Sequence, residues 1–338
     1  MKLVKTTEAE GRTLVHDMTE IIPGKYKGTR FRKGQIIRAE DIPVLLDMGK
    51  ERLCVLDEDG DAADTRGMLH EEEGARRLCS ICRGTNLETA PAREGKIELF
   101  AKTAGLLKID TKKLVALNSA GGMAVITLRG NRSVAEGEKA AAVKIIPLFI
   151  EEEKLRLAEE ICGGEKPVNV IPFKPKKAAL IITGSEIFRK RIPESGSEIV
   201  KRKLEAAGAE CAETVILPDE PDKITAAILG MIEKGIGLVI CTGGMSVDPD
   251  DRTPLGIRNS GARIVSYGVP FMPGFLLLLS YYEKNGLCVP VIGAPACVFY
   301  EKTTALDILL PRLMADDPVS REDLALLGEG GLGGQHIQ

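Results

Sequence analysis

The sequence predicts an α/β fold: a three-layer α/β/α domain with a mostly parallel sheet, preceded by an α+β N-terminal region that contains a small β-rich module. Two observations support this. From residue 178 onward, short apolar runs alternate with segments of helical spacing, the order that produces a parallel sheet covered by helices on both faces. Between Gly95 and Pro147, short apolar segments such as Ile97–Phe100 are separated by turn residues, which indicates a strand-rich module.

The C-terminal half supplies the clearest elements. Ala178–Ile182 is a continuous apolar run, typical of a strand buried on both faces. A helix is predicted over 195–207 and ends at Gly208, a residue suited to a helix C-terminus. The other predicted elements are strands at 211–217, 237–241, 263–266 and 289–292 and helices at 222–233 and 300–314.

The N-terminal half is predicted to mix short strands and helices. Asp41 is a candidate cap for a helix that contains Pro43 in its first turn. Extended segments are expected at 3–6, 11–18 and 52–57, a turn at 57–60, and helices at 68–83 and 151–162. We therefore predict four parts: an α+β region over 1–90, a β-rich module and linker helix over 91–175, an α/β domain over 176–315 and a partly disordered tail over 316–338.

Composition excludes several classes of protein. The 338 residues carry a net charge of −3 and 4% aromatic residues with no Trp, which argues against a nucleic-acid-binding protein. The longest apolar run, Phe275–Tyr282, is too short to cross a bilayer. Lys2 and Lys5 are followed by a polar stretch rather than by a signal peptide. We expect a cytoplasmic protein that binds no membrane.

The chain has eight cysteines, and only Cys79 and Cys82 have the spacing of metal ligands. Three readings are open for this pair. The two thiols can pack on one face of the predicted helix, they can form a metal or redox site, or they can form half of a site that a second subunit completes.

The loop from Thr242 to Pro254 follows a predicted buried strand and is the best candidate for a ligand site. Its two glycines allow the backbone to approach a ligand closely. A helix beginning near Thr253 would direct amide groups at an anion. Three aspartates in the same loop oppose an anion unless a divalent cation lies between them or a carboxyl group holds a proton. The loop therefore predicts a phosphorylated ligand together with Mg²⁺.

Four segments are expected to meet at one edge of the sheet, because each of them follows a predicted strand. They are Thr183–Glu186, Leu217–Asp219, Thr242–Pro254 and Ile292–Pro295. With Pro273-Gly274, these motifs resemble, in the same order, the molybdopterin-binding domain shared by molybdopterin adenylyltransferase and molybdopterin molybdenumtransferase. The resemblance covers residues 177–312. The chain departs from the transferase pattern at Ser185, where an aspartate is usual, and in the short sequence after Met314.

The resemblance implies a site for molybdopterin, Mg²⁺ and ATP or AMP. The implied ligand-binding residues are Thr183, Gly184, Ser185, Glu186, Thr242, Gly243, Gly244, Ser246, Thr253, Gly293 and Pro295. The implied catalytic residues are Asp219 and Asp251, and the implied metal ligands are Asp248, Asp250 and Asp251. Simpler readings stay open: Ser246 as a helix cap, Ser185 as a turn residue, Asp219 as a loop carboxylate and the three aspartates as a solvated turn.

Three functions follow from the resemblance. The first is an enzyme of molybdenum cofactor biosynthesis that transfers an adenylyl group or inserts molybdate. The second is a homo-oligomeric carrier or sensor that delivers the cofactor to a client molybdoenzyme. The third is a nucleotide pyrophosphatase, as in the related domain of competence-damage-inducible proteins.

Overall fold

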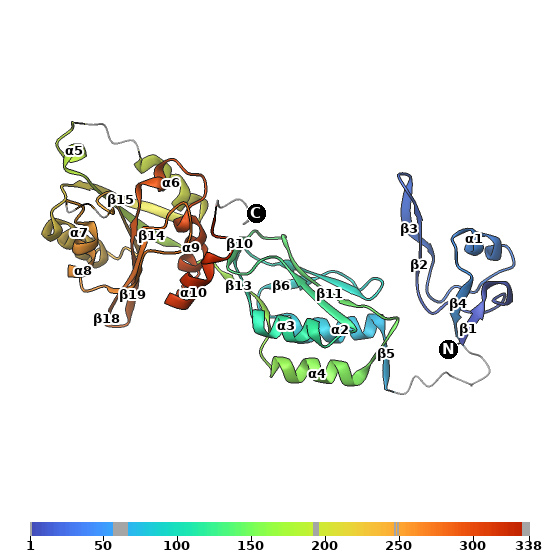
Figure 1. The fold of residues 1–338 in the computed structure, drawn as a ribbon. Coiled ribbons are helices and arrows are strands. Elements are labelled where there is room, and N and C mark those ends of the chain that lie inside the picture. Colours follow the sequence, from blue (N-terminus) through green and yellow to red (C-terminus); the bar gives the residue numbers. More distant parts are fainter. Residues whose placement is uncertain (1, 57–66, 192–195, 247, 249, 333–338) are drawn as a thin grey trace. The chain divides into compact units, whose positions relative to one another are not determined.

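The computed structural model describes residues 2–56, 67–191, 196–246, 248 and 250–332. The chain divides into two compact units (Figure 1). Unit 1 comprises Met1–Phe100, Ile109–Leu128 and Lys139–Asn169, and unit 2 comprises Ala101–Lys108, Arg129–Glu138 and Val170–Gln338. Among the described helices, none is long and apolar enough to cross a membrane.

Unit 1 consists of small antiparallel sheets and helices. Its strands are β1 (Lys2–Lys5), β2 (Met18–Ile22), β3 (Tyr26–Phe31), β4 (Arg52–Val55), β5 (Met68–His70), β6 (Leu87–Thr89), β7 (Lys96–Ala101), β9 (Met123–Thr127), β11 (Lys139–Ile145) and β12 (Phe149–Glu151). Its helices are η1 (Thr6–Glu8), α1 (Asp41–Asp47), α2 (Glu71–Cys82), α3 (Thr111–Ser119) and α4 (Glu152–Cys162). The strands pair as β1-β4, β2-β3, β5-β12 and β6-β7-β11-β9.

Several predictions in this unit are confirmed and several are wrong. Helix α4 matches the predicted 151–162 helix. The predicted 68–83 helix is instead β5 followed by α2, because His70 pairs with Phe149 and its ring accepts the Glu72 N–H at the start of α2. Asp41 does not cap α1: the cap position is Glu40, and the Asp41 carboxylate accepts the Arg38 N–H at 2.9 Å.

Other differences come from local signals that the sequence hides. Helix α3, which begins after Asp110, was missed inside the module predicted to be β-rich. Residues 11–18 contribute isolated bridges at Thr13 and Leu14 rather than a full strand. The predicted turn at 57–60 lies outside the described residues. Cys79 and Cys82 are both buried in α2, and burial raises the pKa of Cys82 to about 12, so these thiols pack as apolar groups.

Unit 2 holds the predicted α/β domain. Its strands are β8 (Gly105–Ile109), β10 (Arg132–Val134), β13 (Val168–Pro172), β14 (Lys176–Thr183), β15 (Ala209–Leu217), β16 (Leu238–Thr242), β17 (Arg263–Tyr267), β18 (Leu278–Lys284) and β19 (Leu287–Ala294). Its helices are α5 (Ser185–Phe188), α6 (Ser197–Ala206), α7 (Pro221–Glu233), α8 (Thr253–Asn259), η2 (Ala296–Phe299), α9 (Ala305–Met314), α10 (Arg321–Ala325) and η3 (Leu326–Gly328).

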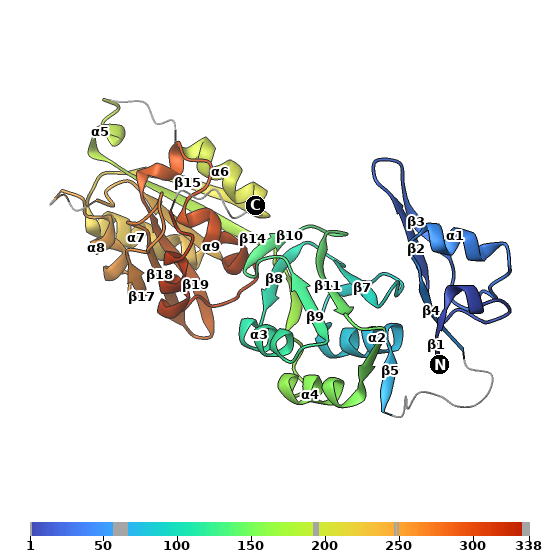
Figure 2. The same ribbon diagram turned by 45° about the vertical axis from the view of Figure 1, so that its right-hand side comes forward.

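Within the described residues, the main sheet has the order β15-β14-β16-β19-β18-β17. Strand β8 lies between β10 and β13 in a separate sheet, and Figure 2 shows β8 beside β10. The first four strands of the main sheet are parallel. Strand β18 is antiparallel to both β19 and β17, so β17 runs in the same direction as β19. The mixed α/β class with a mostly parallel sheet is therefore as predicted.

Alternate residues of the central strands enter two different cores. Leu180 and Ile182 of β14 pack on one face with helices α6, α9 and α10. Ala179 and Ile181 pack on the other face with α7 and α8. This two-residue period places apolar side chains on both faces of the strand, which is why the β14 sequence is continuously apolar.

Two elements near the C-terminus differ from the prediction. Helix α9 begins at Ala305 rather than at residue 300, because Thr304 and Asp307 form a reciprocal capping box. Strand β18 was not predicted, although its sequence falls within the longest apolar run. The predicted tail contains α10 and η3, and residues 333–338 lie outside the described part of the chain.

Candidate ligand-binding site

The candidate site lies at the edge of the main sheet where the parallel strands end. Strands β14 and β15 end at the paired residues Thr183 and Leu217, and β16 and β19 end at the paired residues Thr242 and Ala294. The four loops that follow these strands therefore start at one edge, as the sequence predicts. This is the edge at which open α/β sheets bind ligands.

The turn Gly243–Ser246 approaches neighbouring backbone more closely than a side chain would allow. Gly243 has a φ of +91°, and a β-carbon on it would lie 2.0 Å from the carbonyl oxygen of Thr183. Gly244 has a φ of +52°, and a β-carbon there would lie 2.8 Å from Asp219 Oδ1. Both positions therefore require glycine, for conformation and for space.

Three buried threonines support this turn from behind. The hydroxyl groups of Thr183 and Thr253 lie 2.8 Å apart, and the Thr253 N–H donates to the Gly244 carbonyl at 3.2 Å. Thr183, Thr242 and Thr253 are at most 2% exposed. The Thr183 and Thr253 hydroxyl groups bond each other behind the turn, whereas the buried Thr242 hydroxyl has no hydrogen-bond partner among the described residues.

Two aspartates organise the loops through backbone amides. Asp219 Oδ2 accepts the Ser185 N–H at 2.8 Å, and Asp251 Oδ2 accepts the Ser246 N–H at 2.8 Å. Within the Asp248–Asp251 turn, Asp248 Oδ1 accepts the Asp250 N–H at 3.0 Å. Asp219 Oδ1 is buried and has no hydrogen-bond partner among the described residues. A buried carboxylate oxygen of this kind favours a bound cation or hydrogen-bond donor.

Two pockets of different chemistry meet at this turn. The acidic pocket, of about 760 Å³, is lined by Ser185, Asp219, Glu220, Pro221, Ser246, Asp248, Asp250, Asp251 and Arg252. The apolar pocket, of about 400 Å³, is lined by Gly243, Gly244, Met245, Ser246, Asp251, Met272, Pro273, Gly274, Phe275, Leu276, Pro295, Ala296, Cys297, Tyr300 and Glu301. Ser246 and Asp251 line both of them.

The charges of the acidic pocket decide which ligand it can take. Among the described residues that line it, five are carboxylates and one, Arg252, is a cation. An anionic group would be repelled there unless a metal ion compensates the charge. In the part of the chain that the structure describes, no three His, Cys, Asp or Glu side chains are grouped so as to hold a metal ion by themselves. Any such ion would need ligand oxygens to complete its coordination.

The sequence-predicted site residues fall into three groups. Six line the acidic pocket: Ser185, Asp219, Ser246, Asp248, Asp250 and Asp251. Three more line the apolar pocket: Gly243, Gly244 and Pro295. Thr183, Thr242, Thr253 and Gly293 are buried behind the turn, and Gly184 is the N-cap of α5. The Glu186 side chain lies outside the described residues.

The sequence analysis missed residues at the end of β17, in the connection from β17 to β18 and after η2. Tyr267, at the end of β17, donates its hydroxyl to the Met245 carbonyl at 3.0 Å. Met272, Phe275 and Tyr300 line the apolar pocket and are half or more exposed. Large apolar side chains that are exposed next to a glycine-rich turn would indicate a binding surface, but a sequence does not show which side chains are exposed.

The fold and this edge define unit 2 as an α/β domain with a ligand site at the carboxyl ends of its strands. Among solved structures, tungsten cofactor synthesizing protein MoaB from Pyrococcus furiosus is similar at 15% identity, over 41% of this chain and 88% of that one, with a TM-score of 0.33. Molybdopterin biosynthesis enzyme MoaB from Thermus thermophilus is similar at 19% identity, over 46% and 97% of the two chains, with a TM-score of 0.32.

Sequence comparison identifies the family of this domain. The family described as "Probable molybdopterin binding domain" matches residues 179–315, and a domain of unknown function matches residues 3–57. Molybdopterin molybdenumtransferase from Synechococcus elongatus is 27% identical over 170 residues. That alignment covers 48% of this chain and 40% of the length of the relative. Residues 179–315 thus match a molybdopterin-binding domain family, as their motifs predicted.

Proposed function

We propose that unit 2 binds the phosphate group of molybdopterin, free or adenylylated, at the Gly243–Ser246 turn together with Mg²⁺. The observation that carries this proposal is the position of the turn between an acidic and an apolar pocket. A ligand with a planar ring and a phosphate fits this arrangement, with its ring in the apolar pocket and its phosphate at the shared wall of Ser246 and Asp251.

The residues present fit a magnesium ion. Mg²⁺ in proteins is held by one or two carboxylates together with ligand phosphate and water oxygens. Asp251, with Asp248 and Asp250 in the same turn, supplies such carboxylates, and Asp219 Oδ1 is a further oxygen without a partner among the described residues. The bound ion would neutralise charge between the phosphate and these aspartates. It would allow an anionic ligand to enter a pocket that otherwise repels it.

In this proposal the protein contributes mainly orientation of the ligand. Asp251 and Asp219 hold the Ser246 and Ser185 amides in place, and the fixed loops position the phosphate for reaction. The reaction is either transfer of an adenylyl group from ATP to the pterin phosphate, with release of pyrophosphate, or exchange of the adenylate for molybdate, with release of AMP.

A binding titration of the full chain tests the proposal. Molybdopterin and its adenylate should each bind, and removal of Mg²⁺ should weaken binding at least about tenfold. Asp251→Asn should weaken the Mg²⁺-dependent part of the affinity, because it removes a charge from the shared wall. Glu205→Gln, an exposed carboxylate on α6, is the matched control and should bind normally. Absence of binding by the wild-type protein, with and without Mg²⁺, would refute the proposal.

A non-catalytic carrier or sensor is the second candidate. It is favoured by the engagement of Asp219 and Asp251 with backbone amides, which makes each of them a loop organiser rather than a free base. A carrier would bind the cofactor tightly, would release no AMP with molybdate and would deliver the pterin to a client molybdoenzyme. Activity on ADP-ribose that Asp251→Ala abolishes would instead indicate a nucleotide pyrophosphatase.

A further inference from the structure

Tyr267 reaches the candidate site from a strand that carries none of the site motifs. It is the last residue of β17, the edge strand that runs in the same direction as β19. Its side chain therefore lies at the edge where β14, β16 and β19 end. The hydroxyl group lies 3.0 Å from the Met245 carbonyl oxygen and 3.4 Å from that of Ser246.

These contacts add to the hydrogen bonds that the turn makes with residues that follow it in the chain. Thr253 and Asp251, which follow the turn in sequence, bind it through Gly244 O and Ser246 N. Tyr267 comes from a different strand and bonds the carbonyl groups of Met245 and Ser246. The peptide groups of Met245 and Ser246 are thus fixed from two independent elements of the fold.

The tyrosine hydroxyl can act as a donor across the neutral pH range. Burial and then the nearby Asp251 carboxylate raise the pKa of Tyr267 above its ordinary value. A tyrosinate at this point would face both the carboxylate and two carbonyl oxygens, so the protonated form is favoured.

We propose that Tyr267 is a positioning residue for the ligand site. By holding the Met245 and Ser246 carbonyl groups, its hydroxyl keeps the Ser246 N–H on Asp251 and so fixes the wall that the acidic and apolar pockets share. This inference rests on the proposed function for the identity of the ligand. It predicts that removal of the hydroxyl weakens ligand binding, which loss of a hydrogen bond that serves only the stability of the fold would not do.

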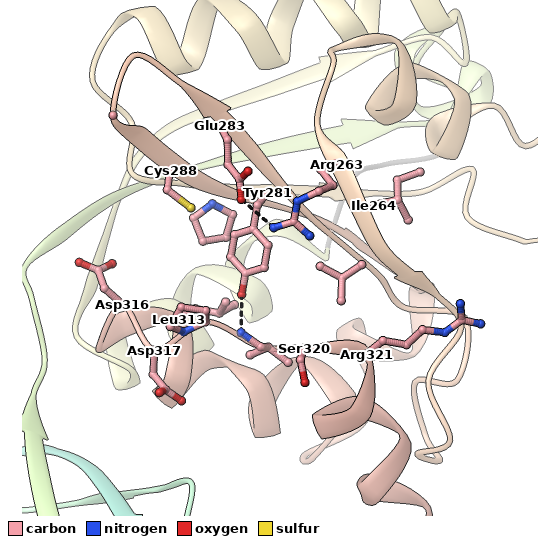
Figure 3. A pocket seen from close by; sticks show the side chains of 15 residues that line it. Arg263, Ile264, Tyr281, Glu283, Cys288, Leu313, Asp316, Asp317, Ser320 and Arg321 are labelled. Atoms are coloured by element: carbon pink, nitrogen blue, oxygen red, sulfur yellow. Dashed lines mark hydrogen bonds and ion pairs between the residues drawn. The ribbon is translucent and has the colours of Figure 1, made fainter.

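Tyr281 offers a matched control in the same sheet (Figure 3). It lies on β18, and its hydroxyl accepts the Val319 N–H at 3.0 Å. Tyr281 pairs with Arg263, the first residue of β17, whereas Tyr267 is the last residue of that strand. Tyr281 therefore lies at the opposite end of β17 from Tyr267. Tyr281 and the Arg263–Glu283 ion pair line a separate pocket of about 680 Å³ there. Tyr281→Phe therefore removes one backbone hydrogen bond without touching the candidate site.

The experiment compares Tyr267→Phe with Tyr281→Phe in the full chain, with molybdopterin plus Mg²⁺ as the probe. We expect Tyr267→Phe to raise the Kd about fivefold to tenfold, the effect of one neutral hydrogen bond expressed entirely in binding. Tyr281→Phe should change the Kd less than about twofold. An unchanged Kd in Tyr267→Phe, or an equal change in both variants, would overturn the proposal.

Two further measurements separate positioning from simple stability. If Tyr267 acts through Asp251, adding Tyr267→Phe to Asp251→Asn should raise the Kd by less than about twofold over that of Asp251→Asn alone. A Kd for the double variant in which the two losses of affinity multiply would overturn the proposal. Amide hydrogen exchange of the ligand-free protein should quicken at residues 243–246 in Tyr267→Phe only. Unchanged exchange there would overturn the proposal whatever the ligand, while failure of the wild type to bind molybdopterin would refute the proposed function alone.

Discussion

Replacement of Gly243 by alanine tests whether the turn approaches β14 as closely as the structure shows. At a φ of +91°, alanine adopts a left-handed conformation that costs about 1–2 kcal/mol. The added β-carbon would also lie 2.0 Å from the Thr183 carbonyl oxygen and 2.8 Å from its hydroxyl oxygen. Thr183 belongs to a central strand paired on both sides, so this backbone oxygen cannot move cheaply. Overpacking of this kind adds about 1–3 kcal/mol, for a total of about 2–5 kcal/mol.

Gly261→Ala is the matched control for this substitution. Gly261 has a similar φ of +83°, but a β-carbon there would meet nothing within 4 Å. Denaturant unfolding should therefore show Gly261→Ala destabilised by about 1–2 kcal/mol and Gly243→Ala by clearly more. Equal losses in the two variants would refute the close approach, because the conformational cost would then account for the whole effect.

Three other predictions concern groups away from the turn. Burial raises the pKa of Cys82 to about 12, so the neutral thiol stabilises the fold below about pH 9, and this contribution is lost as the pH rises toward 12. Between pH 7 and pH 10 the free energy of unfolding should therefore fall by about 1.4 kcal/mol more in the wild type than in Cys82→Ala, as measured by denaturant unfolding. An equal fall in the two proteins would contradict this. The exposed thiol of Cys288 should react with a thiol reagent in the native protein well before Cys82 does, so Cys288→Ser should remove an early labelling phase; an unaltered time course would count against its exposure. Asp307 completes the capping box of α9 and pairs with Lys203 at 2.7 Å. Asp307→Ala should therefore lower the free energy of unfolding by about 2–3 kcal/mol, whereas Glu198→Ala, which removes an exposed carboxylate, should lower it by less than about 0.5 kcal/mol. A similarly small loss in both variants would exclude the cap as a stabilising element.

The sequence predicted the α/β domain well because its buried strands have a strong signal. Strands packed on both faces, such as β14 and β16, are continuously apolar. Strand β18 was missed although Pro273-Gly274 precedes its apolar run and Asn285-Gly286 follows it, a two-residue turn that joins β18 to β19 as a hairpin. In unit 1, the short strand β5 was merged with α2, since three residues before a helix carry no periodicity of their own.

The site was predictable in the loops that follow parallel strands and not elsewhere. Glycines and carboxylates after β14, β15 and β16 were expected at one edge, because parallel strands bring their carboxyl ends together. Tyr267 reaches the same edge at the carboxyl end of β17, and Phe275 lies in the connection from β17 to β18. Sequence order alone does not reveal that β17 runs in the direction of β19. The sequence analysis expected Thr183 to bind the ligand, but the structure places its hydroxyl behind the turn, next to that of Thr253. Which way a side chain points at the end of a strand decides between the two.

A structure of the full chain crystallised with molybdopterin and Mg²⁺ tests the central claim most directly. The account predicts the phosphate group at the Gly243–Ser246 turn, with Mg²⁺ between it and Asp251 and the ring in the pocket lined by Phe275. A phosphate group located elsewhere, such as in the pocket beside Tyr281, would contradict the account.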